Sequence, residues 1–190
     1  MWPNLEPGLT RAIDLLHRSV PALNLPMEAI AQFLVVIAPI VLLAVWVRRD
    51  GYRAALVGLV GAALAFAANQ VIGAVWDRPR PFVFYHFTPL LQHARDASFP
   101  SDHLAVLGAV TLAMLIYSRP LGMWLAAAAL LTAFARVYVG LHYVSDVVDG
   151  FCLGALCSAL AWALFGLLAA PLTALDQRLQ RLKLRPILFG

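Results

Sequence analysis

The run AALVGLVGAALAFAANQVIGAVW, residues 54–76, contains no charged side chain. A helix needs about 20 apolar residues to cross the hydrocarbon core of a bilayer, so this run is long enough to span a membrane. The rest of the chain agrees, because 62% of its 190 residues are hydrophobic and only 13% are charged. Soluble domains carry about 25% charged residues. The sequence therefore predicts a membrane protein whose residues 1–190 form a single membrane-embedded domain.

Four further apolar runs are long enough to be membrane helices, at about residues 27–47, 101–117, 121–139 and 145–172. Together with the first run they predict an all-α, polytopic bundle of five spans. A weaker segment, residues 7–20, places its apolar side chains at helical spacing. That pattern predicts a short amphipathic helix that either lies on the membrane surface or packs against the bundle.

The basic residues predict the orientation of the bundle. Eight of the 14 lysines and arginines fall on one side of the predicted membrane: Arg48, Arg49, Arg53, Arg119, Arg178, Arg181, Lys183 and Arg185. Because these lie in short loops and the tail, the positive-inside rule places the tail, residues 173–190, in the cytoplasm. The loop of residues 77–100 and the short loop of residues 140–144 then face outward. The net charge of +4 is scattered along the chain, so no nucleic-acid partner is expected.

This topology brings three polar stretches to the same outer surface. They are WDRPRPF (76–82), SFPSDH (98–103) and ARVYVGLHYVSD (135–146). In the first, two prolines restrict the backbone around Arg78 and Arg80 to extended conformations at the point where a span ends.

In the second stretch, Ser101 suits the N-cap of the helix that follows, and His103 lies in its first turn. The free N–H groups of that turn, with the helix dipole, favour an anion. The alternative is ordinary capping beside an interfacial histidine.

In the third stretch, Arg136, His142 and Asp146 have the spacing R-x5-H-x3-D. An arginine buried at the membrane boundary is costly unless it is paired. If the turn is helical, His142 and Asp146 share a face. A carboxylate bonded to one imidazole nitrogen makes the other nitrogen the better nucleophile or base. The alternative is a structural salt bridge that closes the loop.

Taken together, three arginines, a hydroxyl and a helix N-terminus suit a phosphate group. Two histidines suit a two-step transfer, in which one attacks phosphorus and the other protonates the leaving oxygen. No cluster of Asp and Glu residues is available to hold Mg²⁺, so we expect a metal-free mechanism without a cofactor.

These stretches resemble the three signature motifs of the type 2 phosphatidic acid phosphatase superfamily, the membrane relatives of the vanadium haloperoxidases. The family pattern is K-x6-R-P, P-S-x-H and R-x5-H-x3-D, matched here by Arg80–Pro81, by residues 100–103 and by residues 136–146. Within the superfamily, the stretches are most similar to the BcrC-type undecaprenyl diphosphatases of bacteria. The resemblance implies a haloperoxidase-like phosphatase core in the bacterial plasma membrane.

The resemblance also implies a role for each motif residue. His142 would be the nucleophile that forms a phosphohistidine, Asp146 would orient it, and His103 would be the general acid. Phosphoryl oxygens would be bound by the side chains of Arg80, Arg136 and Ser101, and by backbone N–H groups near Asp102.

One position departs from the family pattern. The lysine should lie seven residues before Arg80, where this chain has Gly73. Arg78 is the candidate to supply the missing charge as a further phosphate ligand. Asn69 and Gln70 either contribute to the phosphate site or form interhelical hydrogen bonds.

The expected function is hydrolysis of undecaprenyl diphosphate, an isoprenoid diphosphate lipid, to the monophosphate during carrier-lipid recycling in cell-wall assembly. Alternatives are a phosphatase for phosphatidic acid or phosphatidylglycerol phosphate, a lipid phosphotransferase, and a non-catalytic lipid transporter. Four aromatic residues after the first motif either line an opening for the lipid chain or anchor the loop at the interface: Phe82, Phe84, Tyr85 and Phe87.

Overall fold

The computed structural model describes residues 8, 12, 15, 19–48 and 50–181, with side chains up to residue 167. The described part of the chain is built of helices joined by loops, which confirms the all-α prediction. Its elements are η1 (Pro21–Leu23), α2 (Asn24–Phe33), η2 (Leu34–Val36), α3 (Ile37–Trp46), α4 (Tyr52–Trp76), α5 (Pro81–Phe84), α6 (Asp102–Tyr117), α7 (Arg119–Tyr138) and α8 (Val144–Arg181). The amphipathic helix predicted over residues 7–20 lies largely outside the described residues.

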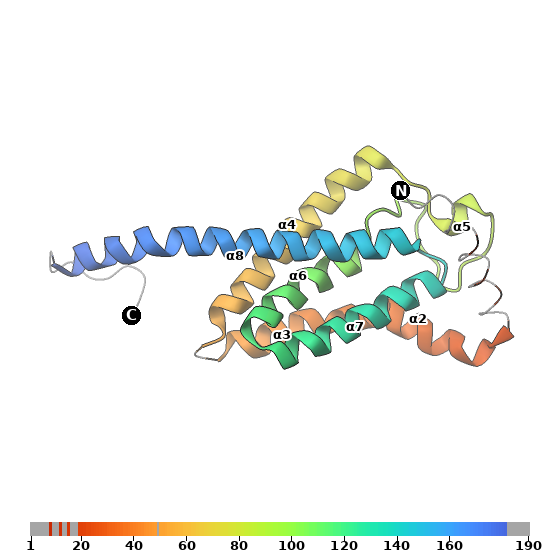
Figure 1. Cartoon of the computed structure of the whole chain (residues 1–190). Coiled ribbons are helices and arrows are strands. Elements are labelled where there is room, and N and C mark those ends of the chain that lie inside the picture. The colour runs from red at the N-terminus through yellow and green to blue at the C-terminus, as the bar shows by residue number, and fades with distance from the viewer. Residues whose placement is uncertain (1–7, 9–11, 13–14, 16–18, 49, 182–190) are drawn as a thin grey trace.

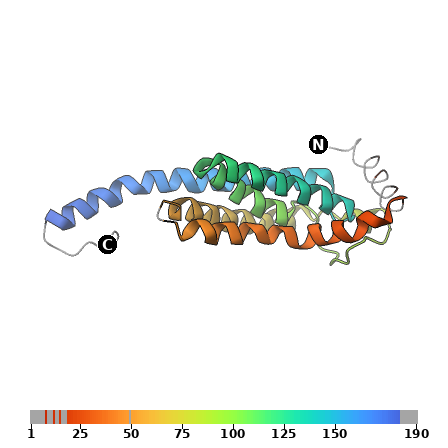
Figure 2. The ribbon, with the colours of Figure 1, turned by 90° about the horizontal axis from the view of Figure 1, so that it is seen from below.

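The first predicted span is not one regular helix. A short 3₁₀ segment, Leu34–Val36, separates α2 from α3. The cause is Pro39, because its ring clashes with the carbonyl group four residues earlier and it has no N–H to donate to that carbonyl. The two helices nevertheless follow one another as a single rod, as the orange ribbon shows (Figure 2).

Within the described residues, four helical segments are long and apolar enough to cross a membrane: Pro21–Trp46, Tyr52–Phe84, Arg119–Tyr138 and Val144–Leu167. The prediction of five spans is therefore only partly supported, because α6, Asp102–Tyr117, is shorter than these. It has 16 residues, which is about 24 Å at 1.5 Å per residue and less than the hydrocarbon thickness of about 30 Å.

α6 lies at the centre of the bundle, packed against α4, α7 and α8. Most of its residues from Leu104 to Met114 are buried. Small residues make the contact with α8 close: a Cβ atom added at Gly150 would lie only 2.7 Å from the carbonyl oxygen of Ser101. Added at Gly154, it would collide with the backbone of Ala105. The two glycines, four residues apart, therefore let the backbones of α6 and α8 approach each other at the N-terminal end of both helices.

Two boundaries differ from the predictions. The helix expected to end at Leu172 continues to Arg181, so half of the predicted tail, residues 173–181, continues α8, which extends beyond the other helices (Figure 1). Inside the outer loop, residues 77–100, the chain forms the short helix α5. Arg80 itself has the expected extended backbone, with φ −63° and ψ 154°, and Pro81 begins the helix, since its fixed φ suits the first helical position.

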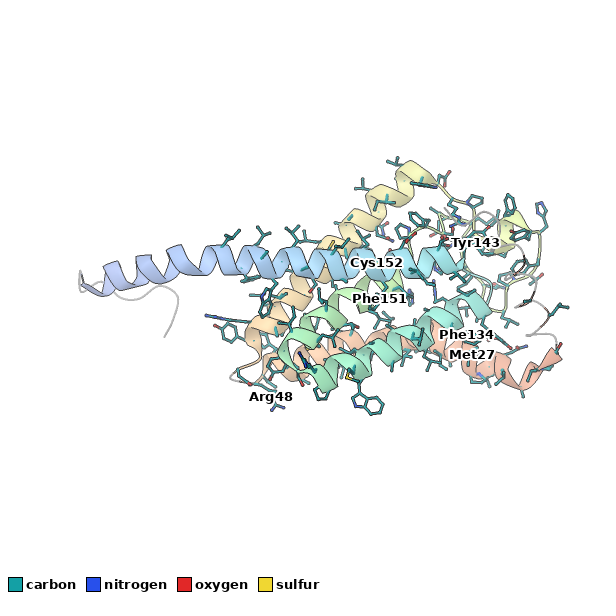
Figure 3. All side chains as sticks on the ribbon, viewed as in Figure 1. Met27, Arg48, Phe134, Tyr143, Phe151 and Cys152 are labelled. Atoms are coloured by element: carbon teal, nitrogen blue, oxygen red, sulfur yellow. The ribbon has the colours of Figure 1, made fainter. Side chains whose placement is uncertain are left out.

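The loops lie at the two ends of the bundle. Tyr143 lies at the end that carries α5 and the loop of residues 77–100, whereas Arg48 lies at the opposite end (Figure 3). This arrangement places the three polar stretches at one end of the bundle and the α3–α4 loop at the other.

Candidate active site

Backbone hydrogen bonds join the three polar stretches. The N–H of Ser98 donates to the carbonyl of Arg78 over 2.8 Å, and the N–H of Ser101 donates to the carbonyl of Asp146 over 3.0 Å. The outer loop is also fastened to the end of α7, because the N–H of Leu90 donates to the carbonyl of Val139 over 3.2 Å. The three polar stretches, which are far apart in sequence, thus lie next to one another at one end of the bundle. The predicted membrane topology placed them on the same side.

His142 lies where these stretches meet, with only 3% of its surface exposed. Its Nε2 lies 2.8 Å from a terminal guanidinium nitrogen of Arg136 and 3.4 Å from one of Arg80. A guanidinium can only donate, so Nε2 must be the nitrogen that carries the lone pair. The proton is then on Nδ1, which donates to the carbonyl oxygen of Ser98 over 2.9 Å. The geometry sets the tautomer that leaves Nε2 free to act as a nucleophile.

The surroundings of His142 also keep its ring neutral. Burial lowers the pKa of His142 well below its usual 6.5, and the positive charges of Arg136 and Arg80 lower it further. A neutral imidazole is the reactive form, since a protonated ring has no lone pair with which to attack phosphorus.

Asp146 lies on the Nδ1 side of the ring, but it is not the group that accepts the Nδ1 proton. Its Oδ2 is 3.6 Å from Nδ1 and accepts the N–H of Tyr143 over 2.9 Å. The predicted proximity of His142 and Asp146 is present, although not through a shared helical face, because His142 precedes the start of α8. The backbone carbonyl of Ser98 takes the hydrogen bond instead.

Arg80 is almost fully buried and held at several points. One terminal nitrogen donates to the carbonyl of Leu141 over 3.1 Å, and Nε lies 2.9 Å from a carboxylate oxygen of Asp96. Burial raises the pKa of Asp96, but the hydrogen bond from Arg80 and its charge lower it more, and the net shift is downward. Asp96 also lies 3.4 Å from Nδ1 of His93.

Among the buried side-chain atoms without a partner in the described residues are donors of two predicted phosphate ligands: Nε of Arg136 and Oγ of Ser101. Arg136 is 4% exposed and donates to the carbonyl of Ala31 over 3.4 Å. In the part of the chain that the structure describes, it forms no ion pair with a carboxylate. Ser101 occupies the predicted N-cap position of α6, but its side chain makes no capping hydrogen bond. Buried polar atoms are nearly always bonded, so both groups are suited to bind an anion.

A cavity of about 360 Å³ opens beside these groups. Its walls include His142, Arg136 and Arg80, and also His103 and Asp102 from the first turn of α6. The cavity therefore brings together both histidines, two arginines and a helix N-terminus, and it has room for a phosphate group. Gly73, at the position of the family lysine, also lines it.

Arg78 is placed differently from Arg80. Its guanidinium lies 2.8 Å from Oδ1 of Asp146 and 2.7 Å from Oγ of Ser145. It is stacked on the ring of Tyr143, 3.9 Å from the ring centroid. Arg78 thus reaches the carboxylate behind His142, whereas Arg80 reaches Nε2.

Asn69 and Gln70 form interhelical hydrogen bonds. Both side chains donate to Oδ1 of Asp102, Gln70 over 3.3 Å, and Asn69 also donates to the carbonyl of Pro100 over 3.0 Å. They connect α4 to the start of α6, and both also line the cavity.

The four aromatic residues of the outer loop separate into two pairs. Phe82 and Phe87 line a second cavity of about 530 Å³ formed by the loop, which shares His93 with the first cavity. Phe84 and Tyr85 stack edge to face on each other and are more exposed.

Three residues at the site were not identified from the sequence: Ser98, Asp96 and His93. Ser98 contributes a backbone carbonyl, which leaves no signal in a sequence. Asp96 and His93 do leave one, because charged and titratable residues are rare in this chain. A search of the outer loop for such residues would have found both.

Comparison with known proteins identifies the family. Residues 54–169 match the PAP2 superfamily, a range that covers more than half of the chain and all three motifs. The chain is 38% identical over 138 residues to the undecaprenyl-diphosphatase BcrC of Bacillus subtilis, covering 70% of this chain and 68% of that protein. It is 30% identical over 172 residues to the putative undecaprenyl-diphosphatase YbjG of Escherichia coli, covering 87% of each.

The fold has solved counterparts as well. The crystal structure of a transmembrane PAP2 type phosphatidylglycerolphosphate phosphatase from Bacillus subtilis matches with a TM-score of 0.66 and 25% identity, covering 83% of this chain and 82% of that one. Sequence and fold agree, and the chain belongs to the PAP2 superfamily of membrane lipid phosphatases.

Proposed function

We propose that this protein hydrolyses undecaprenyl diphosphate to undecaprenyl phosphate and inorganic phosphate. The observation that carries the proposal is the position of Nε2 of His142, which is neutral, buried and held by two arginines beside a cavity with unpaired donors. Support for the lipid comes from two relatives whose names specify undecaprenyl diphosphate.

In the first step, Nε2 of His142 attacks the terminal phosphorus, and the bond from that phosphorus to the bridging oxygen breaks. His103, on the cavity wall, gives its proton to the departing oxygen of the lipid phosphate. The negative charge of the bound diphosphate favours the protonated form of this histidine. Arg80 and Arg136 stabilise the charge that builds on the phosphoryl oxygens in the transition state.

In the second step, water attacks the phosphohistidine. His103, now neutral, takes a proton from the water, and the nitrogen–phosphorus bond breaks to release inorganic phosphate. The hydroxyl of Ser101 and the N–H groups of the first turn of α6, around Asp102, bind the oxygens of the transferred group. No redox partner is needed, and both proton transfers use the same imidazole.

We further propose that α6 is a fifth span and that the site faces outward from the plasma membrane. Because α6 is short, its N-terminus would lie below the level of the outer loop, within reach of a headgroup held at the membrane interface. A site at that depth suits a lipid whose hydrocarbon chain stays in the bilayer.

A panel of purified lipids tests the substrate. Phosphate release should be fastest with undecaprenyl diphosphate, and EDTA should leave it unchanged. If phosphatidic acid is hydrolysed at least as fast, the proposed substrate is wrong. A strict requirement for Mg²⁺ would contradict the phosphohistidine mechanism.

The second candidate is a phosphatidylglycerol phosphate phosphatase. It is favoured by the similarity in fold to a Bacillus subtilis enzyme named for that lipid. The same panel separates the two candidates, because the mechanism at phosphorus is shared and only the ranking of lipids differs.

A further inference from the structure

We propose that Arg78 is a positioning residue for the Asp146–His142 pair, since its guanidinium is bonded to the carboxylate beside Nδ1 rather than placed at Nε2. This inference deepens the proposed hydrolysis and rests on His142 being its nucleophile. Under this inference the two arginines of the first motif have different roles, although only one residue lies between them. Arg78 positions the Asp146–His142 pair, and Arg80 binds phosphate.

The side-chain contacts of Arg78 fix the carboxylate. One terminal nitrogen is 2.8 Å from Oδ1 of Asp146 and 2.7 Å from Oγ of Ser145. The Asp146 side chain is completely buried, while that of Arg78 is 23% exposed. A buried carboxylate needs a cation and hydrogen bonds to remain charged, and Arg78 supplies both.

The two oxygens of Asp146 thereby have separate partners. Oδ1 is taken by Arg78, and Oδ2 accepts the N–H of Tyr143 and faces Nδ1 of His142 at 3.6 Å. A carboxylate held at both oxygens cannot rotate away from the imidazole. When Nε2 bonds to phosphorus, the ring becomes positively charged, and a fixed negative charge at this distance stabilises it.

The backbone of Arg78 acts on the other acceptor beside Nδ1. Its carbonyl accepts the N–H of Ser98 over 2.8 Å, and the carbonyl of Ser98 accepts the Nδ1 proton over 2.9 Å. One residue therefore positions both the carbonyl and the carboxylate that face the same nitrogen. The ring of Tyr143 under the guanidinium, 3.9 Å from its centroid, holds the side chain in this place.

Steady-state kinetics on the full-length protein tests this assignment. Arg78→Met removes the charge and keeps the aliphatic stem, and Arg80→Met is its matched control. For Arg78→Met we expect kcat to fall about 10- to 100-fold with KM changed less than about 3-fold, because substrate binding does not involve this side chain. Arg78→Lys should recover part of the lost kcat. A rise in KM with little change in kcat for Arg78→Met would overturn the inference.

Binding of inorganic phosphate to the same variants, measured by isothermal titration calorimetry, gives a readout that does not depend on the lipid. Arg78→Met should bind phosphate within about 2-fold of the unaltered protein, whereas Arg80→Met should bind at least about 10-fold more weakly. Equal weakening by both variants would make Arg78 a phosphate ligand and overturn the inference.

A double-mutant cycle completes the test. Combining Arg78→Met with Asp146→Asn should cost little more than either change alone, whereas Arg80→Met and Asp146→Asn should add. Additive losses for Arg78 and Asp146 would contradict the inference. If undecaprenyl diphosphate is not the substrate, the cycle is run with the panel lipid that is hydrolysed. A wrong substrate and a wrong role for Arg78 therefore give different results.

Discussion

The two nitrogens of His142 face regions of opposite character. On the Nδ1 side lie the carbonyl of Ser98, which accepts the Nδ1 proton, and the carboxylate of Asp146, which is bonded to the guanidinium of Arg78. On the Nε2 side lie the guanidinium groups of Arg80 and Arg136 and the cavity, and Nε of Arg136 has no partner among the described residues. The first region consists of groups that bond to one another, whereas the second presents cationic donors beside a cavity.

This difference separates orientation from binding. Groups on the Nδ1 side act on the substrate only through the imidazole, so their loss should reduce turnover more than affinity. In the proposed mechanism, groups on the Nε2 side contact the phosphoryl oxygens directly, so their loss should reduce both turnover and affinity. Each of the following predictions tests one part of this comparison, beginning with the largest expected effect.

Replacing the ring that joins the two regions should abolish activity. For His142→Gln we expect kcat to fall at least about 10⁴-fold, because the nucleophile is lost. The measurement is phosphate release from the best lipid of the panel. The matched control is His86→Asn in the outer loop, where φ is 55° and Asn tolerates a positive φ. If His142→Gln stays within about 10-fold of the unaltered protein, another residue is the nucleophile.

Removing a cation on the Nε2 side should have the next largest effect. Arg136→Met should lower kcat/KM about 10²- to 10³-fold, the usual cost of losing a buried donor to a developing negative charge. Inhibition by inorganic phosphate should weaken in parallel. Arg119→Met, at the opposite end of the bundle, is the control and should change neither quantity. Unchanged phosphate inhibition in Arg136→Met would remove this residue from the binding site.

Neutralising the carboxylate on the Nδ1 side should cost less. Asp146→Asn should lower kcat about 10- to 100-fold, because the carbonyl of Ser98 still accepts the Nδ1 proton and keeps the tautomer. KM should change by less than about 3-fold. A loss as large as that of His142→Gln would mean that the carboxylate, rather than the carbonyl, sets the tautomer.

The lowered pKa of His142 predicts how stability depends on pH. Because the folded state holds this ring neutral, the unfolded state binds more protons once the pH falls below about 6.5. The contribution of His142 to the free energy of unfolding should therefore drop as the pH is lowered through that value. From pH 7.5 to 5.5 the loss due to this group should be about 1 kcal/mol. Denaturant melts of the unaltered protein and His142→Gln, compared at both pH values, measure it. The prediction is contradicted if the difference in unfolding free energy between the unaltered protein and His142→Gln is the same at both pH values.

The smallest effect is expected at the edge of the Nε2 region. Asp96 is partly exposed and lies beside Arg80, so its charge repels an incoming phosphate. Asp96→Asn should lower KM about 2- to 3-fold with kcat nearly unchanged, since exposed ion pairs are worth less than about 1 kcal/mol. Lipid titrations at low and high salt would show the change shrinking as salt increases. A rise in KM would show instead that Asp96 serves mainly to position Arg80.

Much of the fold followed from the sequence, because long apolar runs in a charge-poor chain have few alternatives to membrane helices. The runs predicted at residues 54–76, 101–117 and 121–139 each match a helix within two residues at both ends. The break at Leu34–Val36 was missed, although Pro39 is its visible cause. The extension of α8 was missed because the polar residues near its end were interpreted as a tail.

The candidate site also has features that the sequence predicted and features that it did not. Apart from His93, its histidines and arginines were identified because polar residues are conspicuous in this composition and the predicted topology brought them to one end. The direction of Arg78 and the acceptor for Nδ1 were not, because neither follows from residue types. Asn69 and Gln70 were left open between two interpretations, and the structure shows them bonded to the start of α6.

By itself, the sequence determined that this is a helical membrane protein and singled out the side chains for which phosphate chemistry is proposed, since hydrophobicity and ionisable groups are properties of single residues. The tertiary structure alone decided which nitrogen of His142 carries the lone pair and which arginine of the first motif lies beside it. Those features depend on the carbonyl of Ser98 and on the different contacts of Arg78 with Asp146 and of Arg80 with Leu141. Both are set by hydrogen bonds between segments far apart in the chain, which no local pattern encodes.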